Sequence, residues 1–300
     1  MLLTIFCWVA LIFFFAASIY KAYKYAKLPM HGRQDLYPIP LDTNERNKYG
    51  GSYYEDDKWY EKPITRNHVG MIIDMLGEML FIKKLFVNQN SLWWISYSLH
   101  LGIYAALAWT ILLFVGVFVD PAHVFGMIVY FLTTVAGIVA GVLMTVGAVG
   151  LLLKRLLKPE FKNYTTPQEY FNLIFLLCVS ATGLFVWAGD MNFDYGRNIA
   201  SAMIHFKSLS EFYGGSVPVL LTIHIILLGA VMIYIPLTKM SHYVGKFFTF
   251  HNVIWDNEPN LPGSKIESEI VKQSKDPKPA NQWSAPHYQP APAPAEEAKQ

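Results

Sequence analysis

Five long apolar segments constrain the fold of this chain more than any other feature of its sequence. They run approximately over residues 2–20, 92–118, 125–153, 170–188 and 217–237. A helix needs about 20 mainly apolar residues to cross the roughly 30 Å hydrocarbon core of a bilayer. Because lipid offers no partners to backbone N–H and C=O groups, such segments fold as helices. The sequence therefore predicts an all-α integral membrane bundle of five transmembrane helices.

The composition argues against a soluble globular domain, since 53% of the residues are hydrophobic and only 15% are charged. Residues 2–20 could alternatively be a cleaved secretory signal. No basic residue precedes this apolar run, however, whereas Lys21, Lys24 and Lys27 follow it. We therefore expect the first segment to remain as a membrane anchor.

The basic residues are distributed by side of the membrane. Between the first two segments there are 11 Lys and Arg residues, from Lys21 to Lys84. Four more basic residues follow the third segment, and Lys239 and Lys246 follow the fifth, whereas the opposite loops hold only Arg197 and Lys207. Because basic loops stay in the cytoplasm, the sequence predicts an outside N-terminus, a cytoplasmic C-terminus and a long first cytoplasmic loop.

The spans divide the chain into four regions. Residues 1–20 form the first transmembrane helix, and residues 21–90 form a cytoplasmic loop that starts polar and ends in NHVGMIIDMLGEMLFIKKLF. The charges that interrupt this apolar run favour a short amphipathic helix at the interface. Residues 91–245 form the four-helix part of the bundle. In the cytoplasmic segment 246–300, the Pro- and Ala-rich sequence from about residue 261 predicts disorder.

Two absences in the sequence narrow the function. The chain has two cysteines, both inside predicted spans, and no C-x-x-C-H motif, which excludes a covalently attached c-type haem. It shows no internal repeat and no carboxylate within a span, so a secondary transporter has little support. Electron transfer and a purely structural membrane subunit remain as the two main classes.

Two histidines stand at membrane depth, where ionisable side chains are costly and usually functional. His100 lies 16 residues after Lys84, and His224 lies 15 residues before Lys239. At about 1.5 Å per residue, antiparallel helices would bring both to one level. Two facing imidazoles are the axial ligands of a low-spin haem b. The alternative is that each imidazole only hydrogen-bonds to a backbone carbonyl or a Thr hydroxyl.

The remaining histidines lie outside the spans. His205 is on the outer side and could ligate a second haem. Its partner should come from the outer half of the second span, above His100, but that position holds Thr110, and the first histidine after Thr110 is His123. His123 is the other candidate ligand, against the alternative of a solvent-facing loop residue. For His68, His242 and His251, on the cytoplasmic side, contacts at the surface or with a partner are favoured over coordination because no metal-ligand spacing is present.

The order of these features resembles the gamma-subunit family of respiratory nitrate reductase over roughly residues 70–245. The resemblance rests on the run VGAVGLLLKRLLKPEFKNYTTPQEYFN, then MIHF, then TIHIILLGA, with 19 residues from His205 to His224. The long first loop and the segment SHYVGKFFTFHNVIWDNEPN look more like the branch found in membrane complexes of sulfur and sulfate metabolism, such as the cytochrome b subunit of a complex associated with sulfite reduction.

The resemblance implies a haem b on the cytoplasmic side ligated by His100 and His224, and a second haem near the outer face with His205 as one ligand. Thr110 departs from the family pattern and puts the second haem in question. The implied function is electron transfer, within a quinone-linked oxidoreductase, between membrane quinone and a cytoplasmic iron-sulfur subunit similar to heterodisulfide reductase. A periplasmic multihaem cytochrome c is a further implied partner, in a prokaryotic cytoplasmic membrane. The alternative is a membrane anchor or assembly subunit without cofactor.

Overall fold

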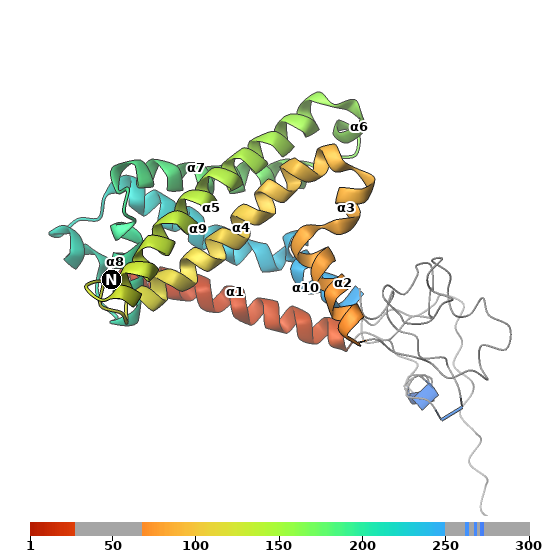
Figure 1. Ribbon diagram of the computed structural model, residues 1–300, viewed down its shortest axis with the longest axis horizontal. Coiled ribbons are helices and arrows are strands. Elements are labelled where there is room, and N and C mark those ends of the chain that lie inside the picture. The colour runs from red at the N-terminus through yellow and green to blue at the C-terminus, as the bar shows by residue number, and fades with distance from the viewer. Residues whose placement is uncertain (28–67, 250–261, 264–266, 269–270, 273–300) are drawn as a thin grey trace, which may run out of the picture. The chain divides into compact units, whose positions relative to one another are not determined.

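The computed structural model describes residues 1–27, 68–249, 262–263, 267–268 and 271–272 (Figure 1). Within these ranges the named elements are all helices, and no strand is present. They are α1 (Leu2–Ala26), α2 (His68–Phe81), α3 (Lys83–Asn88), α4 (Asn90–Gly116), α5 (Val124–Leu157), α6 (Pro159–Lys162), α7 (Pro167–Gly189), α8 (Asp194–Ile204), η4 (Leu209–Tyr213), α9 (Val219–Leu237), η5 (Lys239–Ser241) and α10 (His242–Thr249). The polar part of the first loop and most of the Pro-rich tail lie outside the described residues.

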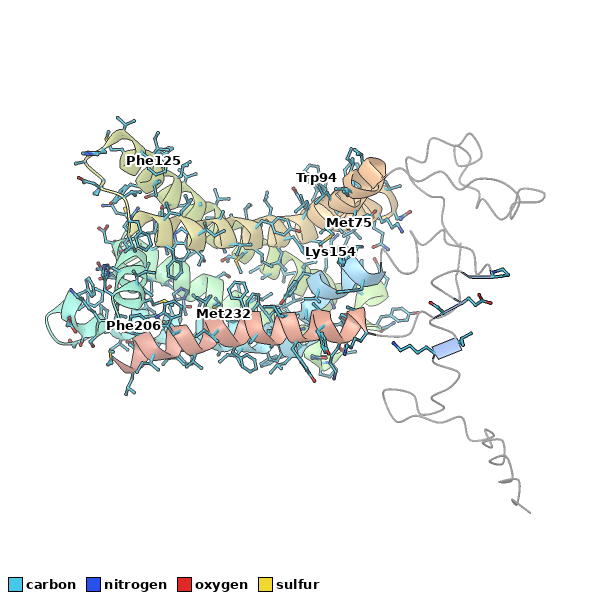
Figure 2. All side chains as sticks on the ribbon, turned by 90° about the horizontal axis from the view of Figure 1, so that it is seen from below. Met75, Trp94, Phe125, Lys154, Phe206 and Met232 are labelled. Atoms are coloured by element: carbon cyan, nitrogen blue, oxygen red, sulfur yellow. The ribbon has the colours of Figure 1, made fainter. Side chains whose placement is uncertain are left out.

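The predicted five spans are confirmed by α1, α4, α5, α7 and α9, which are all long and apolar enough to cross a membrane. In each of them only 17–28% of the most apolar window is buried by the rest of the chain. The other apolar side chains point outward along the helices (Figure 2). This chain is therefore a multi-pass membrane protein whose spans depend on lipid, or on partner subunits, to cover them.

The chain divides into two compact units. The first contains Met1–Lys21 and Leu76–Val244 and so includes all five spans, and the second contains Ala22–Met75 and Gly245–Gln300. The first unit has two ends, with Trp94 and Lys154 at one and Phe125 and Phe206 at the other (Figure 2). We call these the Lys154 end and the Phe206 end.

Glycines set how closely α4 and α5 pack. A Cβ added at Gly147 would stand 2.4 Å from the backbone nitrogen of Leu99, and one added at Gly102 would stand 2.6 Å from that of Met144. Only a residue without a side chain allows such an approach of two membrane helices. Together these contacts make α4 and α5 a tightly packed antiparallel pair.

The other spans join this pair in sequence order, with α5 packed on α7 and α7 packed on α9. The buried core between them includes Leu99 of α4, Ala148 of α5, Leu176 of α7 and Val231 of α9. A second core forms nearer the Phe206 end, where Ala202, Leu209, Leu221 and Ile225 pack together against partly buried residues of α1. All five spans therefore belong to one bundle.

The predicted amphipathic helix over residues 67–86 is helical but broken. The chain has left-handed backbone at Ile82 (φ 51°), between α2 and α3. Glu78 holds this corner by accepting a hydrogen bond from the Lys84 amide at 3.0 Å. The indole of Trp93 donates to the Phe81 carbonyl at 2.7 Å, and so fixes the corner to α4.

Helix α7 begins at a capping box, in which the Glu169 carboxylate accepts from the Thr166 amide at 2.8 Å. The same carboxylate pairs with Lys239 at 3.1 Å and with Arg155 at 3.5 Å. Carboxylates in the first turn also interact favourably with the helix dipole. Glu169 thus ties the start of α7 to the end of α5 and to η5.

Lys21 of α1 closes the C-terminal end of α9. Its ammonium donates to the Pro236 carbonyl at 3.0 Å, to Ser241 Oγ at 2.5 Å and, at 3.5 Å, to the Thr238 carbonyl. The last carbonyls of a helix have no partner within that helix, and a cation there also complements the dipole. Lys21 therefore stabilises both α9 and the turn that follows it.

We expect Lys21→Met to destabilise the detergent-solubilised protein by about 1–3 kcal/mol, since it leaves buried carbonyls without their donor. The measurement is the thermal unfolding midpoint, compared with Lys158→Met, which removes an exposed lysine at the end of α5. Equal midpoints for the two variants would show that the Lys21 contacts add nothing to stability.

Candidate functional site

His100 lies in the Lys154 half of α4, half-buried, with its ring oriented by its own helix. Its Nδ1 stands 2.7 Å from the carbonyl oxygen of Ser96, one turn earlier. Because a carbonyl can only accept, Nδ1 carries the proton and Nε2 keeps its lone pair. This is the tautomer that ligates a metal through Nε2, with the second nitrogen held by a backbone oxygen.

His224 lies on α9 and packs against α7. A Cβ added at Gly183 would stand 3.0 Å from Cε1 of the imidazole, so glycine makes room for the ring. The Thr182 hydroxyl lies 3.1 Å from Nδ1 and donates its own proton to the Cys178 carbonyl at 2.7 Å. Nδ1–H of His224 therefore donates to the hydroxyl oxygen, and Nε2 again keeps a lone pair.

Contacts between neighbouring helices show which residues of α5 and α7 lie level with His100. Residue numbers that face each other on α4 and α5 sum to 246, as for Leu99 with Gly147 and for Gly102 with Met144. On α5 and α7 the facing numbers sum to 325, as for Gly141 with Leu184. His100 is therefore level with residue 146 of α5 and with residue 179 of α7.

His224 contacts α7 close to that level. Its imidazole is hydrogen-bonded to the backbone of Val179, and its Cε1 would stand 3.0 Å from a Cβ added at Gly183. The ring of His224 therefore lies beside the turn of α7 that is level with His100.

His242, for which the sequence favours a contact at the surface or with a partner, lies beside His100. Its ring centroid lies 6.0 Å from that of His100, with 61° between the ring planes. The side chain is exposed, and Nδ1 stands 3.3 Å from the Lys239 carbonyl. The turn η5, in which the Met240 amide donates to Thr238 Oγ1 at 3.3 Å, starts the segment that carries His242.

The candidate ligands at the Phe206 end are separate from one another. His205 is exposed at the end of α8, with Nδ1 2.9 Å from the Ser201 carbonyl. His123 has an 81% exposed side chain and stands 3.9 Å from Asp120. Thr110 donates to the Ala106 carbonyl at 2.9 Å. Within the described residues, no recorded contact joins His205 to either of the others.

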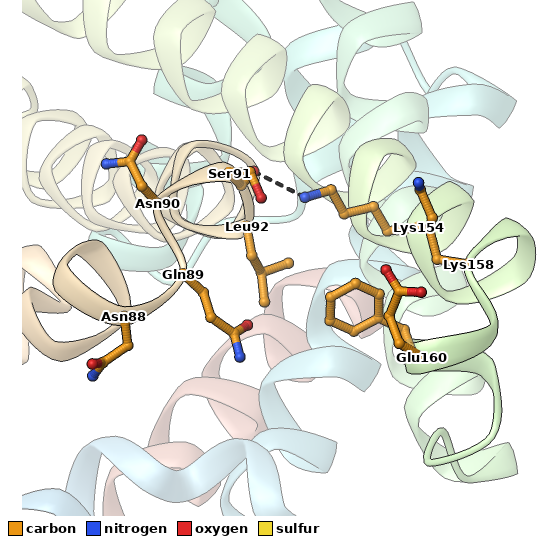
Figure 3. Close-up of a pocket in the computed structure, with 9 residues that line it drawn as sticks. Asn88, Gln89, Asn90, Ser91, Leu92, Lys154, Lys158 and Glu160 are labelled. Carbon is orange, nitrogen blue, oxygen red and sulfur yellow. Dashed lines mark hydrogen bonds between the residues drawn. The ribbon is translucent and has the colours of Figure 1, made fainter.

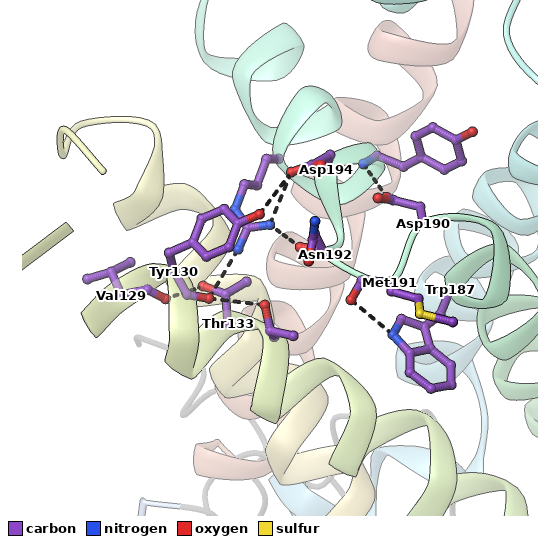
Figure 4. A network of polar contacts seen from close by, with 11 residues as sticks. Val129, Tyr130, Thr133, Trp187, Asp190, Met191, Asn192 and Asp194 are labelled. Carbon is purple, nitrogen blue, oxygen red and sulfur yellow. Dashed lines mark hydrogen bonds and ion pairs between the residues drawn. The ribbon is translucent and has the colours of Figure 1, made fainter. Parts of the chain in front are cut away.

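A polar network at this end fixes α8 against α5 (Figure 4). The Arg197 guanidinium lies 3.6 Å from the centre of the Tyr130 ring and donates to the Tyr130 carbonyl at 3.1 Å. It also donates to the Asn192 carbonyl and pairs with Asp194 at 3.6 Å. Burial lowers the pKa of Arg197, and Asp194 opposes this shift. The network is structural, since every charge in it is paired within the chain.

A polar pocket lies at the Lys154 end, between the start of α4 and the end of α5 (Figure 3). Its lining includes Gln89, Asn90, Lys158 and Glu160, and Lys154 donates across it to the Ser91 carbonyl at 2.9 Å. None of the candidate ligand histidines lines it. The pocket is therefore not part of the histidine site.

The donor set fits a haem better than a metal ion held by the protein alone. Among the described residues, no group of three or more His, Cys, Asp or Glu side chains could hold an ion. A haem brings four nitrogens of its own and asks the protein for axial ligands only. Imidazoles with free Nε2 lone pairs inside an apolar bundle meet that requirement.

Comparison with known proteins gives one finding. A family model described as nitrate reductase gamma subunit matches residues 84–253, more than half of the 300-residue chain. No curated protein and no solved structure matches. The matched region begins before α4 and contains four of the five spans, together with His100, His224 and His242.

Proposed function

Because this chain belongs to the nitrate reductase gamma subunit family, whose members are membrane cytochrome b subunits of respiratory complexes, we propose that it carries electrons between a membrane quinone and a cytoplasmic iron-sulfur subunit. One observation carries this proposal. His100 and His224, on two spans of the bundle, each have Nδ1 hydrogen-bonded and the Nε2 lone pair left for a metal.

In this proposal His100 and His224 would hold haem b, which would supply a one-electron couple when bound. The Ser96 carbonyl and the Thr182 hydroxyl orient the two imidazoles and raise their basicity by accepting from Nδ1–H. Gly183 keeps α7 clear of the His224 ring. The apolar residues around both histidines exclude water, which is how a protein tunes such a couple.

A second haem at the Phe206 end would take His205 as one ligand, with His123 as the further candidate. Thr110 does not fit this role, because its hydroxyl already donates to the Ala106 carbonyl and oxygen is a poor match for a bis-imidazole site. The proposal therefore includes one haem b that uses His100. Measuring the haem content per chain decides whether a second haem is bound.

The distribution of charge supports an orientation. The Lys154 end carries Lys154, Arg155 and Lys239, and we place it at the cytoplasmic face of a prokaryotic inner membrane, with the N-terminus outside. The iron-sulfur subunit, similar to heterodisulfide reductase, would dock there. The sulfur-metabolism branch and a periplasmic multihaem cytochrome c belong to the same proposal, on the basis of the long first loop and the segment after the last span.

The experiment is reduction by quinol. The purified, oxidised chain is mixed with a soluble menaquinol or ubiquinol analogue, and b-type absorbance is followed with time. We expect the haem bands to appear, and dithionite added afterwards gives the full signal for comparison. Haem that dithionite reduces but neither quinol reduces would contradict the link to quinone. A folded chain without any haem band would favour the cofactor-free anchor.

A further inference from the structure

The polar pocket between the start of α4 and the end of α5 has room for a ligand (Figure 3). Its volume is about 600 Å³, within the roughly 300–1,000 Å³ of small-molecule sites. Its polar lining includes the amide and hydroxyl side chains of Asn90 and Ser91 and the charged side chains of Lys154, Lys158 and Glu160. Because the pocket lies apart from the histidine site, its ligand has to be inferred from its own chemistry.

The polar pocket lies at the depth of lipid headgroups. On the α4 side it is lined by residues 88–92, where a polar stretch changes to the apolar run that starts at Leu92. On the α5 side its first lining residue is Lys154, which directly follows the apolar run that ends at Leu153. Both helices are long and apolar enough to cross a membrane. Because their apolar runs stop at the same level, the pocket lies at the boundary between hydrocarbon and water.

The pocket carries a net positive charge. Its two lysines outweigh the single carboxylate of Glu160, which leaves a formal charge of +1. Lys154 Nζ is held across the pocket by donating to the Ser91 carbonyl at 2.9 Å, and an ammonium has two further N–H groups for a ligand. Within the described residues, no recorded ion pair includes Lys158 or Glu160. The charge of the pocket therefore matches a ligand with one negative charge.

Exposed apolar side chains adjoin the charged lining in the sequence. On α5, Leu153 and Leu157 directly precede the two lysines and are 48% and 73% exposed. On α4, Trp94 follows the lining by less than a turn and is 63% exposed, and Trp favours the membrane–water interface. Acyl chains attached to a phosphate in the pocket would cover these side chains, whereas a free phosphate would leave them uncovered. The surroundings of the pocket thus favour a lipid.

We propose that the polar pocket binds the headgroup of an anionic phospholipid, and that phosphatidylglycerol is the lipid whose chemistry fits it. The phosphate accepts from Lys154 and Lys158, as a singly charged phosphodiester does in charge-assisted hydrogen bonds. The glycerol hydroxyls donate to the Glu160 carboxylate. The bound lipid joins the start of α4 to the end of α5 and stabilises the folded chain by binding to it. This site does not involve the haem and goes beyond the proposed function.

The test is native mass spectrometry of the full-length chain, delipidated in a neutral detergent and titrated with phosphatidylglycerol or phosphatidylcholine. We expect phosphatidylglycerol to bind more tightly than phosphatidylcholine and to raise the unfolding midpoint more. Lys154→Gln and Lys158→Gln should each weaken phosphatidylglycerol binding about five-fold, the usual contribution of one lysine near an anionic lipid. Without lipid, Lys158→Gln should unfold at the wild-type midpoint, because its exposed side chain has no recorded ion pair within the described residues.

Lys162→Gln is the matched control, because it makes the same change of charge in α6 and lies outside the lining. It should bind phosphatidylglycerol as the wild type does. Equal binding of the two lipids, or phosphatidylglycerol binding that neither pocket lysine affects, would overturn the inference. Displacement of the lipid by millimolar inorganic phosphate would show a site for free phosphate instead. If Lys158→Gln keeps the lipid but loses a co-purifying iron-sulfur subunit, the pocket serves an acidic partner and the lipid assignment is wrong.

Discussion

His100→Ala is expected to abolish one haem b signal completely while the helical bundle still forms. This imidazole is the ligand that the proposed haem requires from α4, and α4 carries no other histidine. Removing an axial ligand costs far more affinity than losing one of its orienting contacts. The measurement is haem per chain by the pyridine haemochrome method, together with far-UV circular dichroism.

His123→Ala provides a comparison, since its side chain is 81% exposed in a loop. We expect it to keep the His100 haem, whatever its effect at the Phe206 end. His224→Ala should also lower the haem content, because the proposed haem site uses that imidazole. A His100→Ala chain that binds the full complement of haem would show that the ligand is assigned to the wrong residue.

Gly147→Val is expected to have the second large effect, on assembly of the bundle. Even the first side-chain carbon would stand 2.4 Å from the Leu99 backbone nitrogen and 2.7 Å from its Cα. Because backbone atoms cannot rotate away, α4 and α5 must separate. Overpacking typically costs about 1–3 kcal/mol and occasionally more, and a shift of two helices belongs at the upper end of that range.

The measurement is the yield of monodisperse protein and its unfolding midpoint in detergent. Gly116→Val on α4 is the matched control, since a Cβ there would have its nearest neighbour at 3.9 Å. We expect Gly116→Val to remain close to wild type. If Gly147→Val were equally stable, the close approach of α4 and α5 would be unnecessary for folding. The separation of α4 from α5 would also disturb the histidine site, since Leu99 adjoins His100.

The spans could be predicted from the sequence because their signal is local. Each is an apolar run of the length that lipid dictates, and the five helices agree with these runs to within a few residues at most ends. The largest difference is in α1, which continues to Ala26, beyond Lys21 and Lys24. Long basic side chains can reach the interface from within a helix, so their charge did not mark its end.

The arrangement at the site depends on contacts that no local pattern reports. Depth estimated from flanking charges put His100 and His224 at one level, but the groups that orient the two rings, the Ser96 carbonyl and the Thr182 hydroxyl, have no signal of their own in the sequence. The position of His242 depends on Lys21, more than 200 residues earlier, which holds the turn after α9. Neither the corner at Ile82 nor this turn has a periodic signature.

The reduced-minus-oxidised absorbance spectrum of the purified wild-type chain, with haem counted per chain, shows whether the bundle binds haem b. We expect b-type bands and at least one haem for each chain, lost in part or whole when His100 is replaced. A folded, monodisperse chain that shows no b-type absorbance after reduction with dithionite would contradict it.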